Sequence, residues 1–344
     1  MSPARLLDRR PHDPLDFEGT VELLRIESDA LRGNALGDRH VRELPIYVPP
    51  GTREGDALPL VFVLAGFTGR GQAFLKTDPW GPGLLSKIDR AMAAGSIPPA
   101  VLVMPDCFTK LGGSQYVNSS AVGAYEDHVA DELVPLACAE LPVAEDRRAV
   151  VGKSSGGFGA LRLAMVRPGL FSACGSISGD CGFENTFPGE FLACLRGLVA
   201  YDMDPARFLD AFYQEPDLSG DGHAIINTLA MAACYSPNPD SPLGFDLPFD
   251  LATGELVPEV WERWLDFDPL RTVERHADAL GGLRYLHVEC GLTDEFHIQW
   301  GTRRLARALT RLDVTHVHEE HPGGHFRTDG RYLELLPRLI RALG

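Results

Sequence analysis

The segment Gly152–Gly156 has the pattern Gly-x-Ser-x-Gly, in which small residues flank a central serine. This pattern is typical of a sharp turn from a strand into a helix, because only small flanking residues fit there. A strand-like run at 148–151 precedes it, and the glycine-rich segment 156–164 continues as a helical pattern. The motif therefore predicts a strand–turn–helix unit with the hydroxyl of Ser154 at the tip of the turn.

The same residues are also similar to the end of a phosphate-binding loop, Gly-x-x-x-x-Gly-Lys-Ser. That loop needs a glycine at position 147 so that its backbone amides can wrap a phosphate, and Arg147 stands there. We therefore favour a nucleophilic serine over a nucleotide site. A five-residue pattern is a weak signal in a chain with 36 glycines, so the hypothesis depends on whether a base and an acid follow.

Continuous apolar runs along the chain are typical of strands that are buried on both faces of a parallel sheet. They occupy residues 58–65, 100–106, 149–151, 173–178, 285–290 and 314–318. Helical patterns between or after them cover residues 127–141, 299–312 and 332–343. Two N-terminal runs, 19–26 and 40–48, alternate apolar and polar residues and indicate antiparallel edge strands. The predicted fold class is α/β, with a mostly parallel central sheet and helices on both faces.

One long segment, residues 180–268, interrupts the alternation of strands and helices. Its first part, 183–212, has helical character, and 236–249 is rich in proline, aspartate and aromatic residues. Segments of this length without sheet strands are normally lids or insertions. We expect 1–179 and 269–344 to form the core and 180–268 to form a cap over the site. A surface excursion unconnected with catalysis is the alternative.

An acid and a base follow the serine in the chain order Ser, Asp, His that this kind of turn requires. Asp294 comes just after the predicted strand 285–290, and His325 follows the strand 314–318 in a glycine-rich loop. The carboxyl ends of parallel strands meet at one edge of a sheet. We therefore expect His325 to take the proton of Ser154, and Asp294 to orient His325 and stabilise its cation.

The remaining titratable residues fit these roles less well. As the base, His297 comes too soon after the acid, and as the acid, Glu289 lies inside its strand. A metal site is an alternative, because three histidines cluster near the last strand, namely His316, His318 and His321. No catalytic His-Glu-x-x-His pattern accompanies them, so we expect no metal and no cofactor.

The negative charge that develops on an attacked carbonyl needs backbone N–H groups to stabilise it. One candidate donor is the N–H of Ser155, the residue after the nucleophile. The second is the N–H of Phe67 in the loop 65–69 that follows an earlier strand. The alternative for this loop is an ordinary glycine turn.

Charge and cysteine content exclude several classes of partner. The formal net charge is −16, with 48 acidic against 32 basic residues, so nucleic acid and membrane surfaces are not expected partners. No apolar run reaches the length of a membrane span, and the N-terminus lacks the apolar core of a signal peptide. Seven cysteines without a Cys-x-x-Cys pair indicate buried, reduced thiols. We expect a cytoplasmic protein, and the sequence gives no indication of its oligomeric state.

With these pieces in place, the sequence resembles the "putative esterase" family of α/β-hydrolases. This family includes esterase D (S-formylglutathione hydrolase), the enterochelin-type, feruloyl and acetylxylan esterases, and the mycolyltransferases. The resemblance runs from about residue 42 to the end, except the cap, and rests on residues 66–69, 112–116, 125–135, 152–157, 291–294 and 323–325. It implies an α/β-hydrolase fold with a triad of Ser154, Asp294 and His325. It also implies an oxyanion hole formed by Phe67 and Ser155.

The resulting hypothesis is a serine esterase that cleaves a small-molecule carboxylic ester through an acyl-serine intermediate. An acyltransferase or a thioesterase of the S-formylglutathione hydrolase type on the same triad is an alternative, as is a non-catalytic binding protein. The cap is longer than in esterase D-like members. Its aromatic residues have two interpretations. They either contact an apolar or aromatic group in the acyl or alcohol part of the substrate, or they simply form the core of the cap itself. These residues are Phe245, Phe249, Trp261 and Trp264.

Overall fold

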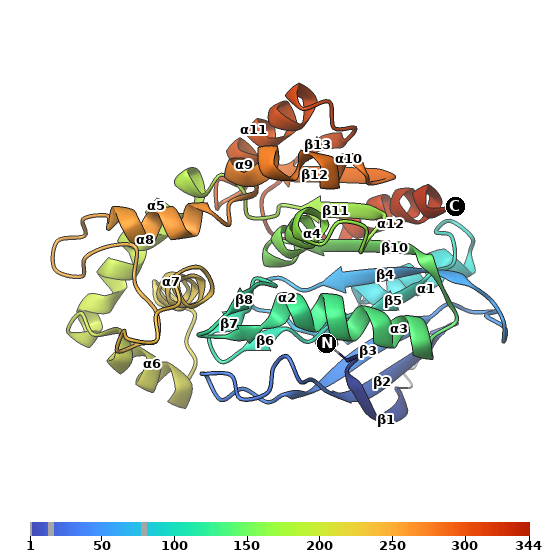
Figure 1. The fold of residues 1–344 in the computed structure, drawn as a ribbon, viewed down its shortest axis with the longest axis horizontal. Helices are drawn as coiled ribbons and strands as arrows, with labels where there is room; N and C mark the ends of the chain where they lie inside the picture. The colour runs from blue at the N-terminus through green and yellow to red at the C-terminus, as the bar shows by residue number, and fades with distance from the viewer. Residues whose placement is uncertain (1, 13–16, 77–80) are drawn as a thin grey trace.

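The computed structural model describes residues 2–12, 17–76 and 81–344, and its centre is a nine-stranded sheet (Figure 1). The strand order is β1-β2-β3-β5-β4-β10-β11-β12-β13. In chain order these strands are β1 (Arg5–His12), β2 (Thr20–Glu27), β3 (Val41–Val48), β4 (Leu58–Leu64), β5 (Val101–Val103), β10 (Val143–Lys153), β11 (Ala173–Ile177), β12 (Tyr285–Gly291) and β13 (Val317–His321). All neighbours from β5 to β13 are parallel, which confirms the predicted mostly parallel sheet.

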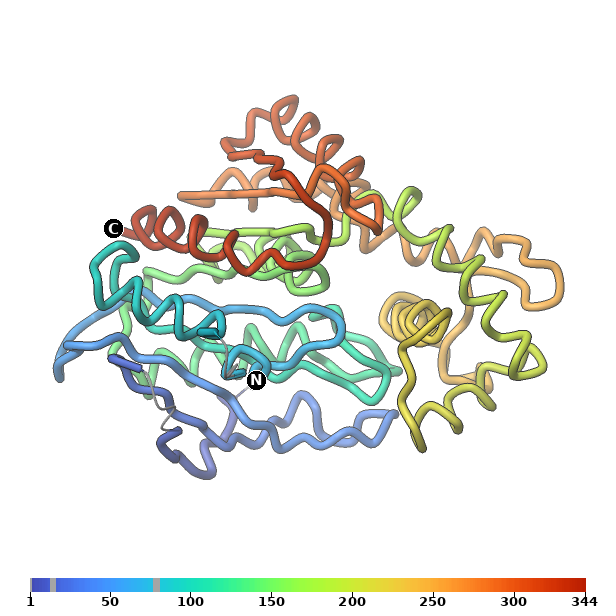
Figure 2. Tube along the Cα trace, turned by 180° about the vertical axis from the view of Figure 1, so that it is seen from behind, coloured from blue at the N-terminus to red at the C-terminus, as the bar shows by residue number. Residues whose placement is uncertain are grey.

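Helices cover both faces of this sheet, as predicted. One face carries α1 (Leu84–Ala93) and α12 (Asp329–Leu343), which lie in front in Figure 2. The other face carries α2 (Tyr125–Asp127), a π-helical turn η2 (His128–Leu133), α3 (Val134–Glu140), α4 (Ser155–Val166), α10 (Ala277–Gly281) and α11 (Ile298–Arg311). Side chains alternate along each strand, so Phe62 packs under the second group of helices and Val61 under α1 and α12.

Strand β11 leads into a group of helices that lies beyond one end of the strands (Figure 1). The group consists of α5 (Phe183–Leu198), η3 (Val199–Tyr201), α6 (Pro205–Gln214), α7 (Gly222–Tyr235) and α8 (Pro258–Leu265). The carboxylate of Asp268 accepts hydrogen bonds from the N–H groups of Gly182 (2.9 Å) and Phe183 (2.8 Å). These two hydrogen bonds connect the end of the segment 180–268 with its start.

The aromatic residues of this helical group form its own core. The ring of Phe191 lies 5.2 Å from Phe249, 5.6 Å from Trp261 and 5.4 Å from Trp264, measured between centroids. All three, and Phe245 with them, are buried. The sequence left two interpretations of these aromatic residues open. The structure supports the one in which they form the core of the segment 180–268, and not the one in which they contact the substrate.

The remaining helices and strands are short. They are η1 (Gly71–Leu75), the hairpin β6 (Phe108–Thr109) with β7 (Gly112–Gly113), the hairpin β8 (Asn118–Ser119) with β9 (Gly123–Ala124), α9 (Pro269–Thr272) and η4 (Val273–His276). Within the ranges that the structure describes, no helix is both long and apolar enough to cross a membrane.

Two strand predictions need correction. The runs that predicted edge strands are β2 and β3, which are antiparallel but lie inside the sheet, because β1 pairs outside β2. The pairing of the highly charged β1 includes side-chain ion pairs, such as that of Arg9 with Glu22, which hydrophobic patterning does not reveal. The last strand is Val317–His321 rather than 314–318, because its polar residues pair with β12 while Val314 packs in the core before it.

Candidate active site

Ser154 sits in the predicted sharp turn between β10 and α4. Its backbone has φ 59° and ψ −128°, a conformation that costs energy for any residue with a side chain and that is concentrated at functional sites. A Cβ on Gly152 would lie 2.3 Å from the carbonyl oxygen of Gly156, and one on Gly156 would lie 2.2 Å from that of Leu64. The two glycines of the motif are therefore required by backbone contacts, and they hold the serine at the tip of the turn.

The structure brings Ser154, His325 and Asp294 together in one hydrogen-bonded chain. The Nε2 atom of His325 lies 2.9 Å from Ser154 Oγ, and its Nδ1 atom lies 2.8 Å from Asp294 Oδ2. An ionised carboxylate only accepts hydrogen bonds, so Nδ1–H donates to Asp294, and Nε2 is left to accept the serine proton. Only 2% of Asp294 and 3% of His325 are exposed, so water competes little with these contacts.

The surroundings of Asp294 keep it ionised. Burial would raise the pKa of this carboxyl, but the hydrogen bond and the charge of His325 outweigh burial and lower it. The backbone N–H of Phe296 donates to Oδ1 (3.0 Å), and the Cys290 thiol donates to Oδ2 (3.5 Å). Asp294 therefore has a fixed orientation and presents a negative charge to the imidazole.

The loop that carries His325 is anchored by Glu295, a residue that the sequence analysis did not single out. The Oε2 atom of Glu295 accepts a 2.6 Å hydrogen bond from the backbone N–H of His325. A Cβ on Gly324 would lie 2.4 Å from the same oxygen, so a larger residue there would displace the Glu295 carboxylate. The ring of Phe296 packs edge-on against the imidazole, with centroids 4.7 Å apart. No local sequence pattern indicates this role of Glu295.

The two residues predicted to supply oxyanion donors, Phe67 and Ser155, also line this site. The N–H groups of Phe67 and Ser155 have no acceptor within the part of the chain that the structure describes, and both residues line the cavity beside Ser154. The carbonyl oxygen of Phe67 accepts a 2.8 Å hydrogen bond from Gly113 N–H, which fixes the orientation of the Phe67 loop. Gln115 donates to the Oγ of Ser155 (2.9 Å) and fixes the orientation of that side chain. This arrangement suits two donors that await a developing oxyanion.

A cavity of about 220 Å³ opens at Ser154 between the sheet edge and the helices α5 and α7. The sheet side contributes residues around the serine and the histidine, while the helices contribute Thr186, Phe187, Glu190, His223 and Asn227. None of the aromatic residues at positions 245, 249, 261 and 264 is among the described residues that line it. Four of the five residues that these two helices contribute have polar or titratable side chains, and the fifth is Phe187.

The cavity holds a second carboxyl, Asp180, which the sequence analysis also did not single out. Asp180 comes just after β11 and is 8% exposed. Burial, and next the charge of Asp294, raise the pKa of Asp180 to about 7, although Lys153 on the same cavity lowers it. Burial also lowers the pKa of Lys153. Asp180 thus lies buried in the cavity that contains Ser154 and His325, and this burial disfavours its charged form.

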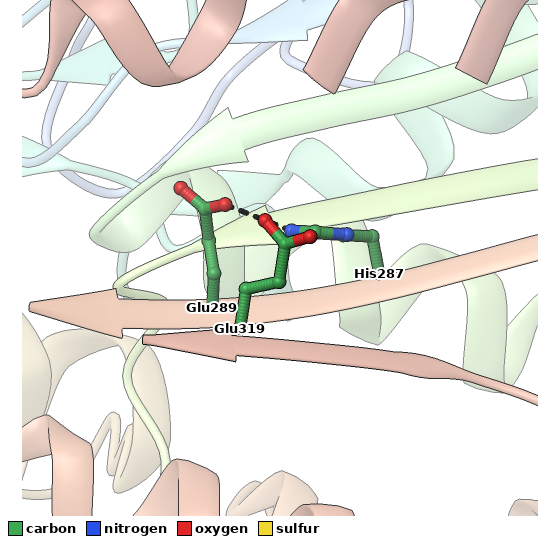
Figure 3. A group of neighbouring side chains, drawn as sticks. All are labelled: His287, Glu289 and Glu319. Carbon is green, nitrogen blue, oxygen red and sulfur yellow. Dashed lines mark hydrogen bonds and ion pairs between the residues drawn. The ribbon is translucent and has the colours of Figure 1, made fainter. Parts of the chain in front are cut away.

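One group of side chains has the donor spacing of a metal site, and it is not the histidine cluster considered above as an alternative. Figure 3 shows His287, Glu289 and Glu319 rising from the same face of β12 and β13, with ligand atoms within 4.8 Å of one another. Arg331 of α12 contacts both carboxylates, at 2.7 Å and 2.8 Å from Glu289 and at 3.1 Å from Glu319. Arg331 already pairs with both carboxylates and Arg338 also pairs with Glu319, so these carboxylates do not fit a cation. His316, His318 and His321 form no such group within the described residues.

Comparison with known proteins gives one family and a set of structural neighbours. A family model described as "Putative esterase" matches residues 37–329. The chain is similar to a ferulic acid esterase, with 16% identity, a TM-score of 0.61 and coverage of 95% of this chain and 100% of that one. It is also similar to an S-formylglutathione hydrolase from Agrobacterium tumefaciens, with 16% identity, a TM-score of 0.58 and coverage of 99% and 100%.

A third neighbour is the enterobactin esterase of Shigella flexneri, with 18% identity, a TM-score of 0.53 and coverage of 100% of this chain and 61% of that one. No curated protein gives a significant sequence match. At these identities the likeness to the solved structures extends to the fold. The three neighbours are named for different substrates, so the fold leaves the substrate open.

Proposed function

The chain belongs to the "Putative esterase" family and is a carboxylic ester hydrolase, and we propose that it works through an acyl-serine intermediate on Ser154. The observation that carries the proposal is the hydrogen-bonded chain from Ser154 Oγ through His325 to Asp294, with contacts of 2.9 Å and 2.8 Å. These are the distances at which a base can accept the proton of a nucleophile.

In the first half of the reaction, Ser154 Oγ attacks the carbonyl carbon of the ester while His325 Nε2 takes the serine proton. The carbonyl oxygen becomes an oxyanion, and the N–H groups of Phe67 and Ser155 donate to it. Losing one such donor typically costs about 3–4 kcal/mol of transition-state stabilisation. The imidazolium then gives its proton to the leaving alkoxide oxygen as the ester C–O bond breaks, which leaves the acyl group on Ser154.

In the second half, water takes the place of the alcohol. His325 removes a proton from the water as its oxygen attacks the acyl carbon, and the same two N–H groups hold the second oxyanion. The proton passes to Ser154 Oγ as the acyl–oxygen bond breaks, so the free acid leaves and the enzyme is restored. Throughout, Asp294 keeps the imidazole in the tautomer that presents Nε2 to the serine.

The same groups would attack a thioester, and one structural neighbour is an S-formylglutathione hydrolase. We therefore include thioesters among the compounds to be tested. We also propose that residues 180–268 form a cap on a core made of 1–179 and 269–344. This division is supported by Asp268, which joins both ends of the segment, and by the aromatic core that the segment forms for itself.

The proposal is tested by trapping the intermediate. Protein quenched with acid during turnover of p-nitrophenyl acetate should carry one acetyl group on the peptide that contains Ser154. Ser154→Ala should lose both the adduct and turnover, while Ser96→Ala, at a serine outside the cavity, should keep both. An acetyl group on another residue, or turnover by Ser154→Ala at the wild-type rate, would refute the assignment.

A further inference from the structure

The wall of the cavity formed by the cap presents polar side chains at helical spacing. Helix α5 contributes Thr186 and Glu190, four residues apart, and α7 contributes His223 and Asn227, also four residues apart. Residues at this spacing lie on one face of a helix. Two helices of the cap therefore turn a polar face toward the cavity that contains the serine.

Glu190 is the charged group of this wall. Its Oε2 atom is buried and has no hydrogen-bond partner in the described part of the chain. The nearest basic group is Nδ1 of His223, at 3.9 Å, and burial lowers the pKa of that imidazole, which favours its neutral form. Burial also raises the pKa of Glu190, against the Asn227 amide, which lowers it. The folded protein thus holds a carboxyl in the cavity without a cation to neutralise it.

Asp180 adds a second acidic group to the same cavity. Within the described residues, no lysine or arginine nitrogen lies within ion-pair distance of Asp180 or Glu190. Lys153 shares the cavity and acts on Asp180 from farther away. Asp180 is buried, and the side chain of Glu190 is 21% exposed although its Oε2 atom is buried. A buried carboxyl without a cationic partner lowers the stability of a protein, and such groups cluster at functional sites.

Building on the proposed ester hydrolysis, we propose that Glu190 binds a protonated amine of the substrate, so that the preferred substrates are esters that carry an ammonium group beneath the cap. An ammonium group has three donors and a full positive charge, which match the carboxylate of Glu190. The side-chain oxygens of Asn227 and Thr186 offer further acceptors on the same wall. The net charge of −16 also favours the approach of cations.

The test compares esters of equal shape that differ only in charge. On the acyl side, p-nitrophenyl 3-aminopropanoate is compared with p-nitrophenyl butanoate. On the alcohol side, 4-(aminomethyl)phenyl acetate is compared with 4-ethylphenyl acetate, and 4-(hydroxymethyl)phenyl acetate separates charge from hydrogen bonding. We expect the ammonium compound to have a kcat/KM at least about tenfold higher than its alkyl partner on one of the two sides, as one charge-assisted contact provides.

Variants of Glu190 assign the preference to this carboxylate. In Glu190→Gln the ratio of kcat/KM between the ammonium and the alkyl ester should fall at least about fivefold, while Glu190→Asp, which keeps the charge, should retain part of it. Glu184→Gln is the matched control, because Glu184 lies on the same helix, is half exposed and lies outside the cavity. This control should keep the wild-type ratio.

The outcomes separate this inference from the proposed function. No turnover of any ester would refute the hydrolysis itself. Turnover of alkyl esters without a preference for ammonium on either side would refute only the role of Glu190. If the preference lies on the alcohol side, an equal preference for the hydroxymethyl and aminomethyl compounds would also overturn it. An unchanged ratio in Glu190→Gln would overturn it on either side.

Discussion

Replacing Arg331 with methionine should destabilise the protein far more than a change at the neighbouring arginine. Arg331 makes a two-pronged contact with Glu289, at 2.8 Å from Nε and 2.7 Å from a terminal nitrogen. The side chain of Glu289 is fully buried, and its remaining partner is His287 at 2.8 Å. Removing one partner of a buried ion pair typically costs about 3–5 kcal/mol, because the other charge is left in a low-dielectric interior.

Arg338 is the matched control for this change. It lies about two turns farther along α12 and pairs with Glu319, but the two side chains are 40% and 32% exposed. An exposed pair of this kind contributes about 0–1 kcal/mol. At roughly 2 °C of Tm per kcal/mol for a large domain, Arg331→Met should lower Tm by about 6–10 °C and Arg338→Met by at most about 2 °C.

The assay is thermal unfolding followed by circular dichroism across a range of pH. Burial would raise the pKa of Glu289, but Arg331 and His287 outweigh it and lower that pKa. The stabilisation is therefore present above the ordinary carboxyl pKa near 4.3 and is lost as the pH falls below it, so the Tm gap should narrow in acid. Equal Tm losses in Arg331→Met and Arg338→Met at pH 7 would refute the reasoning, and so would a loss of Tm on adding EDTA to the wild type.

Three further changes test the site. Asp294→Asn should lower kcat about 10³–10⁴-fold with little change in Tm, because an amide cannot hold the required tautomer of His325; a loss below tenfold would contradict this. Glu295→Ala should lower kcat about tenfold with KM nearly unchanged, because it removes the hydrogen bond that holds the His325 loop. A change confined to KM would contradict this. Asp180→Asn should raise Tm, and by more at pH 8 than at pH 4.5. The pKa of Asp180 is raised to about 7, so the stability of the wild type falls as the pH rises toward that value. The total loss is up to roughly 4 kcal/mol. An increase in Tm that does not depend on pH would contradict this.

The proximity of Ser154, Asp294 and His325 could be predicted from the sequence because each position depends on local chemistry. The glycines of the turn that holds Ser154 are required by backbone contacts, and Asp294 and His325 each follow a strand with its own short glycine-containing loop. Parallel strand ends meet at one edge, so the chain order Ser, Asp, His was enough to bring the three together.

The supporting residues could not be found in this way. Glu295 acts on a loop thirty residues later, and the raised pKa of Asp180 follows from burial and from the nearby Asp294, so neither role has a local pattern. The cap aromatics gave two equally good interpretations, because burial in a core and exposure to a substrate require the same residue types. The four-residue spacing of Thr186 and Glu190 can be seen in the sequence, but the sequence does not show that this face of the helix points toward the cavity.

Fluorophosphonate labelling tests the central claim most directly, because the probe reacts with serines that a base has activated. The wild-type protein should be labelled on Ser154 alone, Ser154→Ala should not be labelled, and His325→Ala should be labelled much more slowly than the wild type. Ser96→Ala should be labelled like the wild type. Labelling of Ser154→Ala to the wild-type extent, or no labelling of the folded wild-type protein, would contradict an activated serine at the end of the His325–Asp294 chain.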